Sequence, residues 1–167
     1  MRTRTAVVVG AAALACLALA QVANSRGRSF LWNASPSEPP GLYVRTSAPV
    51  QVGRLVAFLA PPAAYPYADR RLAYLRQVPI IKAVGAGEGA LVCTSGGALE
   101  INGHRRAAIL AVDSQGVSLP HWRDCRRLRK GEVFVFSDRV PNSFDSRYFG
   151  PVDQAEILGV YRPLFTL

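Results

Sequence analysis

The chain has 167 residues, half of them hydrophobic, and a formal net charge of +9. That length suits one domain with a buried core, and the hydrophobic share excludes disorder as a description of the whole chain. Among its 20 basic residues only Lys82 and Lys130 are lysines. The arginines are scattered and no motif of stacking aromatic residues accompanies them, so we expect no nucleic-acid partner. We interpret the charge as a solvated basic surface with some affinity for anionic membrane lipid.

The N-terminal residues indicate export. Arg2 and Arg4 precede an apolar run of about 18 residues that ends near Ala23, which is the short end of what spans a bilayer as a helix. Ala18-Leu19-Ala20 also fits the small-x-small pattern at which signal peptides are cut. We therefore expect residues 1–28 to be a membrane anchor or signal segment with a short polar linker, and residues 29–167 to be exported. Both fates stay open; we favour retention, because a retained helix would hold the domain at the membrane surface.

The exported part is predicted to be mostly β. It begins with a Pro- and Ser-rich segment, residues 33–41, whose three prolines within five residues exclude a regular helix or central strand. One soluble helix is predicted, Asp69 to Gln77, from the helical spacing of Leu72 and Leu75. Short strand-like runs, most of them separated by Gly, Pro or Asn, indicate antiparallel connections. These runs are residues 42–45, 55–59, 78–84, 91–94, 98–102, 133–136 and 157–161.

Lys82 is a candidate general base. It lies in the most apolar stretch of the exported part, residues 78–84, of a chain that otherwise places arginine where it needs positive charge. Arginine cannot give up its proton, whereas a desolvated lysine can. The alternative is that Lys82 points off the solvent face of a half-buried strand.

The Pro- and Ser-rich loop supplies candidate nucleophiles, Ser35 and Ser37. A rigid loop fixes the position of a hydroxyl before substrate arrives, which favours nucleophilic catalysis. The alternative is that both are ordinary turn serines.

A third segment, Ser143-Phe144-Asp145-Ser146-Arg147-Tyr148-Phe149-Gly150, completes a resemblance to a known family. Together with Ser37-x-x-Pro40 and Lys82, it resembles the three motifs of the bacterial type I signal peptidases, in the same order. More narrowly, Asn33-x-Ser35-x-Ser37-x-Pro39-x-Gly41-Leu42-Tyr43 resembles the TraF-type branch, the conjugative-transfer peptidases that mature pilin subunits. The resemblance extends from about Ser29 to the C-terminus.

This resemblance implies a role for each matching residue. Ser37 would be the nucleophile and Lys82 its general base, with Ser35 and the Ser37 backbone N–H forming the oxyanion hole. Ser143 would orient the lysine amine, and Asp145 and Arg147 would brace the site. No cofactor or metal is implied, and His104 and His121 are interpreted as structural or surface residues. The chain departs from the family at Ala83, where arginine usually follows the lysine, at the turn Glu88-Gly89-Ala90, and at Arg54.

The cysteines predict a disulfide. Cys16 lies inside the apolar run, which leaves Cys93 and Cys125 as an even pair in an oxidising compartment. Their placement is also typical of the TraF-type branch. The alternative is two buried free thiols; neither has a partner at metal-ligand spacing, so we do not expect zinc.

The fold implied by the resemblance is a signal-peptidase and LexA-like antiparallel β-fold with one short helix, preceded by one transmembrane helix. The implied protein is a membrane-anchored serine endopeptidase that cuts exported precursors, such as pilin subunits, after small residues. It would act on the periplasmic face of the inner membrane. A housekeeping signal peptidase and a non-catalytic, membrane-tethered assembly factor of a conjugation apparatus are the alternatives.

Overall fold

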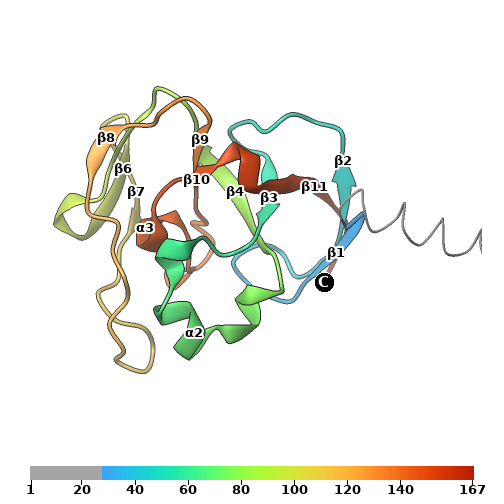
Figure 1. The fold of residues 1–167 in the computed structure, drawn as a ribbon, viewed down its shortest axis with the longest axis horizontal. Coiled ribbons are helices and arrows are strands. Elements are labelled where there is room, and N and C mark those ends of the chain that lie inside the picture. The colour runs from blue at the N-terminus through green and yellow to red at the C-terminus, as the bar shows by residue number, and fades with distance from the viewer. Residues whose placement is uncertain (1–27) are drawn as a thin grey trace, which may run out of the picture.

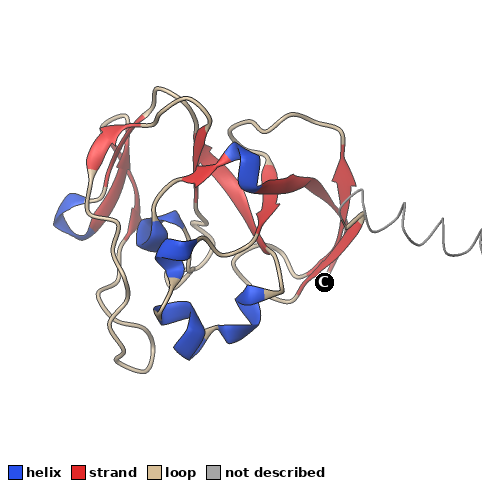
Figure 2. Ribbon diagram, in the orientation of Figure 1, coloured by secondary structure: helices blue, strands red, loops and turns tan. Residues whose placement is uncertain are grey.

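Two antiparallel sheets build residues 28–167, the part of the chain that the computed structural model describes (Figures 1 and 2). The mostly β, antiparallel architecture expected from the sequence is confirmed. The larger sheet has the order β1 (Phe30–Asn33), β2 (Gly41–Thr46), β11 (Ile157–Thr166), β3 (Leu55–Phe58), β4 (Ile80–Ala86), β9 (Glu132–Val135) and β10 (Val152–Asp153). The smaller sheet has the order β7 (His104–Ala108), β6 (Ala98–Ile101), β5 (Leu91–Cys93) and β8 (Cys125–Arg127). Figure 1 shows the smaller sheet at the opposite end of the domain from β1 and β2.

Each of the seven predicted strands overlaps a strand of the structure, and the four strands that sequence reasoning missed are all edge strands. β1 and β10 end the larger sheet, and β7 and β8 end the smaller one. An edge strand pairs on one side only and is often short or polar, so its sequence carries a weak pattern: β10 has two residues, β8 three and β1 four. In β7, for example, four of the five residues are exposed.

The single predicted helix is wrong in extent. The chain instead forms α2 (Tyr67–Arg71) and a separate 3₁₀ turn, η2 (Ala73–Arg76), because the backbone of Leu72 leaves the helical region at φ −142° and ψ 42°. Leu72 and Leu75 both pack against the same core cluster, as their spacing predicts. A second short helix, α3 (Ser146–Phe149), was not predicted, because four residues are too few to show a periodicity. The remaining 3₁₀ turns are η1 (Pro62–Ala64), η3 (Ser95–Gly97) and η4 (Gln154–Glu156).

Three apolar clusters form the core of the described residues, and β4 and β9 both contribute to the two larger ones. Neighbouring residues of β9 face opposite sides, so Val135 enters one cluster and Phe134 the other. In β4 the pairing with β9 shifts register between Val84 and Ala86, and these two residues likewise enter different clusters. Phe144 packs against both clusters. The segment that leads from β9 to α3 is therefore fixed between them, beside the strand that carries Lys82.

The predicted disulfide between Cys93 and Cys125 is confirmed, and it joins two residues directly paired between β5 and β8. None of the helices within residues 28–167 is long and apolar enough to cross a membrane. The predicted anchor lies in residues 1–27, outside the part that the structure describes.

Candidate active site

The Pro- and Ser-rich segment forms a constrained loop between β1 and β2, held by Asn33. The Asn33 amide donates to the carbonyl oxygens of Ser35 and Glu38, both at 2.9 Å, and its Oδ1 accepts the Ser35 N–H at 3.1 Å. The Tyr43 hydroxyl donates to the Pro39 carbonyl at 2.6 Å. At the end of the loop only glycine fits position 41, since a Cβ there would lie 2.2 Å from a carbonyl oxygen of β11. These bonds fix the position of Ser37, which is 3 % exposed.

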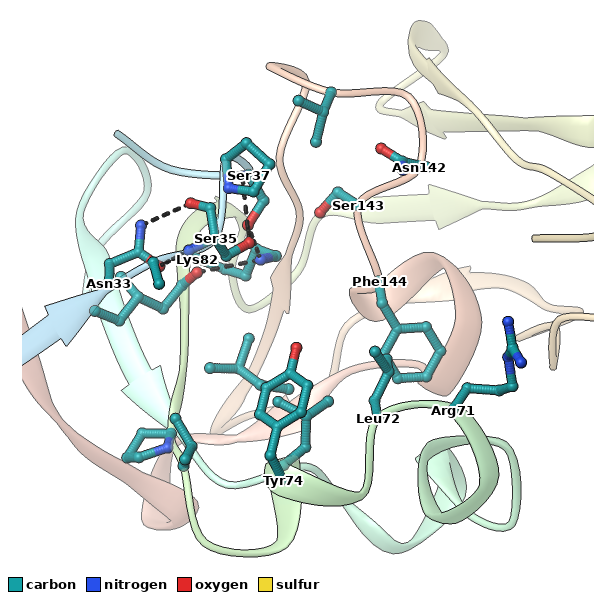
Figure 3. A pocket seen from close by; sticks show the side chains of 18 of the residues that line it. Asn33, Ser35, Ser37, Arg71, Leu72, Tyr74, Lys82, Asn142, Ser143 and Phe144 are labelled. Carbon is teal, nitrogen blue, oxygen red and sulfur yellow. Dashed lines mark hydrogen bonds between the residues drawn. The ribbon is translucent and has the colours of Figure 1, made fainter. Parts of the chain in front are cut away.

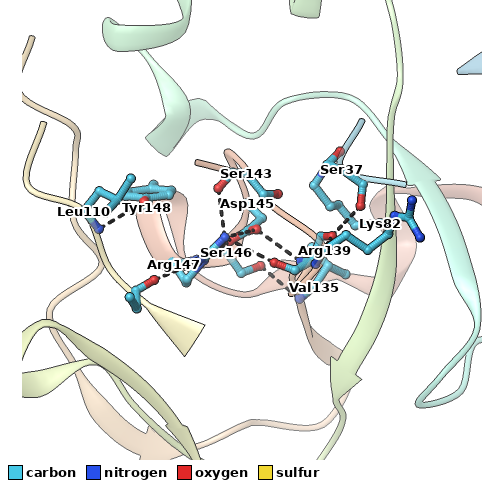
Figure 4. A network of polar contacts seen from close by, with 12 residues as sticks. Ser37, Lys82, Leu110, Val135, Arg139, Ser143, Asp145, Ser146, Arg147 and Tyr148 are labelled. Carbon is cyan, nitrogen blue, oxygen red and sulfur yellow. Dashed lines mark hydrogen bonds and ion pairs between the residues drawn. The ribbon is translucent and has the colours of Figure 1, made fainter. Parts of the chain in front are cut away.

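Lys82 enters the same place from β4. Its side chain is 4 % exposed, so it does not point off the solvent face of the strand. The Lys82 amine lies 2.6 Å from the Ser37 hydroxyl oxygen and also contacts the Ile81 carbonyl at 3.3 Å (Figure 4). The Glu38 carboxylate accepts the N–H of Ala83 at 3.2 Å, which ties the serine loop to β4 directly beside the lysine.

The surroundings of Lys82 favour its neutral form. Burial lowers the pKa of the Lys82 amine, and the charge of Arg147 lowers it further, while the negative charges of Asp145 and Glu38 offset part of this effect. Burial also raises the pKa of the Glu38 carboxyl, although the nearby Lys82 charge opposes that shift. A lysine with a lowered pKa, in contact with a serine hydroxyl, is able to accept that hydroxyl's proton.

Ser35 lies beside Ser37, as the expected oxyanion hole requires. The two hydroxyl oxygens are 2.9 Å apart, and the Ser37 N–H donates to the Ser35 hydroxyl at 3.4 Å. Both groups expected to form the oxyanion hole, the Ser35 hydroxyl and the Ser37 N–H, thus lie next to the Ser37 hydroxyl oxygen. Neighbouring donors of this kind can stabilise a developing negative charge.

Asp145 and Arg147 form an ion pair that is inaccessible to solvent. They are 0 % and 1 % exposed, and the guanidinium binds both carboxylate oxygens, at 2.8 Å and 2.9 Å (Figure 4). Arg147 also donates to the carbonyl oxygens of Ala108, Ser137 and Ser143. It therefore joins the smaller sheet to the segment after β9. Within residues 28–167 no hydrogen bond joins the pair to Lys82, and Asp145 acts on the lysine through its charge.

Ser143 lines the cleft that contains Ser37 and Lys82, but its hydroxyl oxygen is buried and has no hydrogen-bond partner among residues 28–167. Its expected contact with the lysine amine is not formed in this structure. A serine outside the expected set, Ser137, contacts Ser37: its hydroxyl donates to the Ser37 carbonyl oxygen. Sequence reasoning missed Ser137, because Ser-Asp-Arg after a strand looks like any polar turn.

A cleft of about 840 Å³ opens in front of these groups (Figure 3). Two unpaired strand edges line it. Within residues 28–167, β1 pairs only with β2, and Ile80 to Lys82 of β4 pair with β3 but not with β9, whose pairing starts at Val84. The opposite wall includes Leu72, Tyr74, Asn142, Ser143 and Phe144. Free backbone groups on facing edges suit an extended peptide.

Several known proteins are similar to this chain. A family model described as signal peptidase, peptidase S26, matches residues 2–165. The plasmid transfer protein TraF of Escherichia coli is 32 % identical over 98 % of this chain and 96 % of its own length. The conjugal transfer protein TraF of Agrobacterium tumefaciens (strain 15955) is 34 % identical over 99 % of this chain and 98 % of its own. A crystal structure of a signal peptidase I from Enterococcus faecalis V583 is 23 % identical with a TM-score of 0.42, covering 69 % of this chain and 98 % of that one.

Proposed function

The chain belongs to the signal peptidase family, peptidase S26, and we propose that it is a serine endopeptidase in which Ser37 is the nucleophile and Lys82 the general base. The observation that carries the proposal is the 2.6 Å contact between the Ser37 hydroxyl and a buried lysine amine. The mostly β, signal-peptidase-like fold and the TraF relatives, which match over nearly the full chain, support a peptidase role.

The proposed reaction is peptide hydrolysis by acyl transfer. The neutral Lys82 amine takes the Ser37 proton as the hydroxyl oxygen attacks the scissile carbonyl carbon. The Ser37 N–H and the Ser35 hydroxyl donate to the oxyanion, and the Lys82 ammonium then protonates the departing amine. Water, deprotonated by the same amine, releases the acyl group from Ser37. Asp145 and Arg147 would brace the groups that hold Ser37, and Ser143 would turn toward the lysine amine when substrate is bound.

The proposed substrates are exported precursors, cut after small residues and bound as an extended strand between the free edges of β1 and β4. The names of the relatives refer to plasmid and conjugal transfer, which favours precursors of the conjugation apparatus such as pilin subunits. A housekeeping signal peptidase would use the same chemistry on other precursors.

We place the enzyme at the periplasmic face of the inner membrane, with residues 1–28 as anchor and residues 29–167 as catalytic domain. Phe30, Trp32 and Phe165 are each more than half exposed, and the rings of Trp32 and Phe165 lie 6.3 Å apart. Phe30 follows Ala23, the end of the apolar run, by seven residues of sequence. Exposed aromatic rings so close to an apolar segment suit the boundary between bilayer and water.

The experiment compares processing of a co-expressed conjugative pilin precursor by the full chain and its variants in membranes. Ser37→Ala, Lys82→Ala and Lys82→Arg should each abolish processing and leave the melting temperature unchanged within a few degrees. Lys82→Arg should be inactive because a guanidinium cannot act as base. Lys130→Arg is the matched control, because Lys130 is the other lysine of the chain and is exposed; it should process normally. An active Lys82→Arg variant would refute the Ser37/Lys82 assignment. Cleavage of general secretory precursors in preference to pilin would favour the housekeeping enzyme, and full conjugation by Ser37→Ala would favour the assembly factor.

A further inference from the structure

We propose that Ser137 is a positioning residue that fixes the nucleophile by holding the backbone carbonyl of Ser37. This inference rests on the proposed function, since it takes Ser37 as the nucleophile. Ser137 follows β9, is 3 % exposed, and reaches the serine loop across 100 residues of sequence.

The hydrogen bonds of the Ser137 hydroxyl fix the direction of its proton. Its oxygen accepts the N–H of Arg139 at 3.3 Å, and its single proton goes to the Ser37 carbonyl, which can only accept. The Ser137 proton is therefore committed to the Ser37 carbonyl and is not available to the lysine amine.

The backbone of Ser137 is in turn held by the buried ion pair. Its N–H donates to Asp145 Oδ2 at 3.2 Å, and its carbonyl accepts from Arg147 at 3.3 Å. Both members of the pair are almost completely buried, so they cannot move without disturbing the core. Ser137 is thus the hydrogen-bonded connection from Asp145 and Arg147 to Ser37.

A bond to the Ser37 carbonyl bears on catalysis because that carbonyl belongs to the nucleophilic residue itself. Holding it fixes the backbone rotation of Ser37, and with it the direction in which the hydroxyl and the N–H face the cleft. Asn33 and Glu38 fix the loop on its other sides. A displacement of about 1 Å in a nucleophile can lower the rate roughly 10²-fold.

The test uses the full-length chain in detergent and an internally quenched peptide centred on Ala-Leu-Ala, the sequence of residues 18–20. Ser137→Ala should lower kcat about 10- to 100-fold and leave KM within about three-fold. It should not move the acid limb of the pH profile, because the charged groups near Lys82, namely Glu38, Asp145 and Arg147, are unchanged. Ser137→Thr keeps the hydroxyl and should restore most of kcat.

Ser146→Ala is the matched control. Ser146 is 0 % exposed and accepts the Val135 N–H at 3.1 Å, but in the part of the chain that the structure describes its hydroxyl makes no hydrogen bond to Ser37. It should melt at a lower temperature and keep its kcat. The proposal is overturned if Ser137→Ala keeps the wild-type kcat, if Ser137→Thr is as impaired as Ser137→Ala, or if Ser146→Ala loses kcat equally. Cleavage that survives Ser37→Ala would instead refute the proposed function; an inactive Ser37→Ala beside an unimpaired Ser137→Ala would refute this inference alone.

Discussion

Replacing Arg147 with alanine should cost the folded protein about 5 kcal/mol of its free energy of unfolding. The guanidinium is 1 % exposed, binds both oxygens of Asp145, and donates to the three carbonyls of Ala108, Ser137 and Ser143. Removing one partner of a buried ion pair costs about 3 to 5 kcal/mol, because the other charge stays buried without compensation. The carbonyls that lose their donor add a further cost of about 1 kcal/mol or more, reduced where water enters the vacated space. Since a domain of this size has a total stability of roughly 5 to 15 kcal/mol, the variant should be close to unfolding.

The assay is urea unfolding of the full chain with the disulfide intact, followed by tryptophan fluorescence. Arg147→Lys keeps the charge but not the planar fork, and should fall between the wild type and Arg147→Ala. Arg127→Ala is the control, because Arg127 is exposed and its side chain makes a single hydrogen bond among the described residues, to the Gly89 carbonyl. It should change the free energy of unfolding by no more than about 0.5 kcal/mol. A loss below about 1 kcal/mol for Arg147→Ala would refute the reasoning that this pair braces the site.

The other predictions concern pH, the disulfide and the N-terminus. Burial lowers the pKa of Lys82 below its ordinary value of 10.5, so kcat/KM should rise with pH as the amine loses its proton. Between the lowered pKa of Lys82 in the folded chain and its ordinary value in the unfolded chain, the unfolded chain binds more protons than the folded one. The free energy of unfolding should therefore rise with pH in that range, and Lys82→Met should remove the rise. Urea titrations at several pH values measure this, and an unchanged slope in Lys82→Met would contradict it. Replacing Cys93 and Cys125 by serine should lower stability by about 3 to 4 kcal/mol, and peptide mapping without reductant should show the cross-linked pair; two freely alkylated thiols would count against it. N-terminal sequencing of the mature protein should find the apolar segment retained, whereas a start at Gln21 would mean that it is lost.

The sequence predicted the parts of the fold that are buried. Central strands such as β3 and β9 carry apolar runs because they are covered on their faces, and these were predicted. Strands β7 and β8 exist because a neighbour pairs with them, and exposed residues such as Arg105 and Arg127 give no sign of it. The helix predicted across Leu72 divides where the backbone of that residue leaves the helical region, and the apolar spacing of Leu72 and Leu75 gives no sign of this break.

The site was predictable where a motif carries it and not where tertiary structure alone creates it. Ser37 and Lys82 are 45 residues apart, and no local pattern places their side chains in contact, but the segments around them resemble family motifs. Ser137 belongs to no such motif, and its contact with Ser37 depends on how the segment after β9 folds back over the loop. The role of Ser143 stays a prediction, since its hydroxyl makes no hydrogen bond in this structure.

The most direct test of the Ser37/Lys82 assignment is to trap the acyl-enzyme. The full chain is mixed with the p-nitrophenyl ester of N-acetyl-Ala-Leu-Ala and quenched within seconds by acid, which stops deacylation by protonating the amine. Mass spectrometry of the digested protein should then find the acyl group on Ser37 in the wild type, and on no residue of Ser37→Ala or Lys82→Arg. Acylation of a different residue, or an equal yield on Ser37 in Lys82→Arg, would contradict the account.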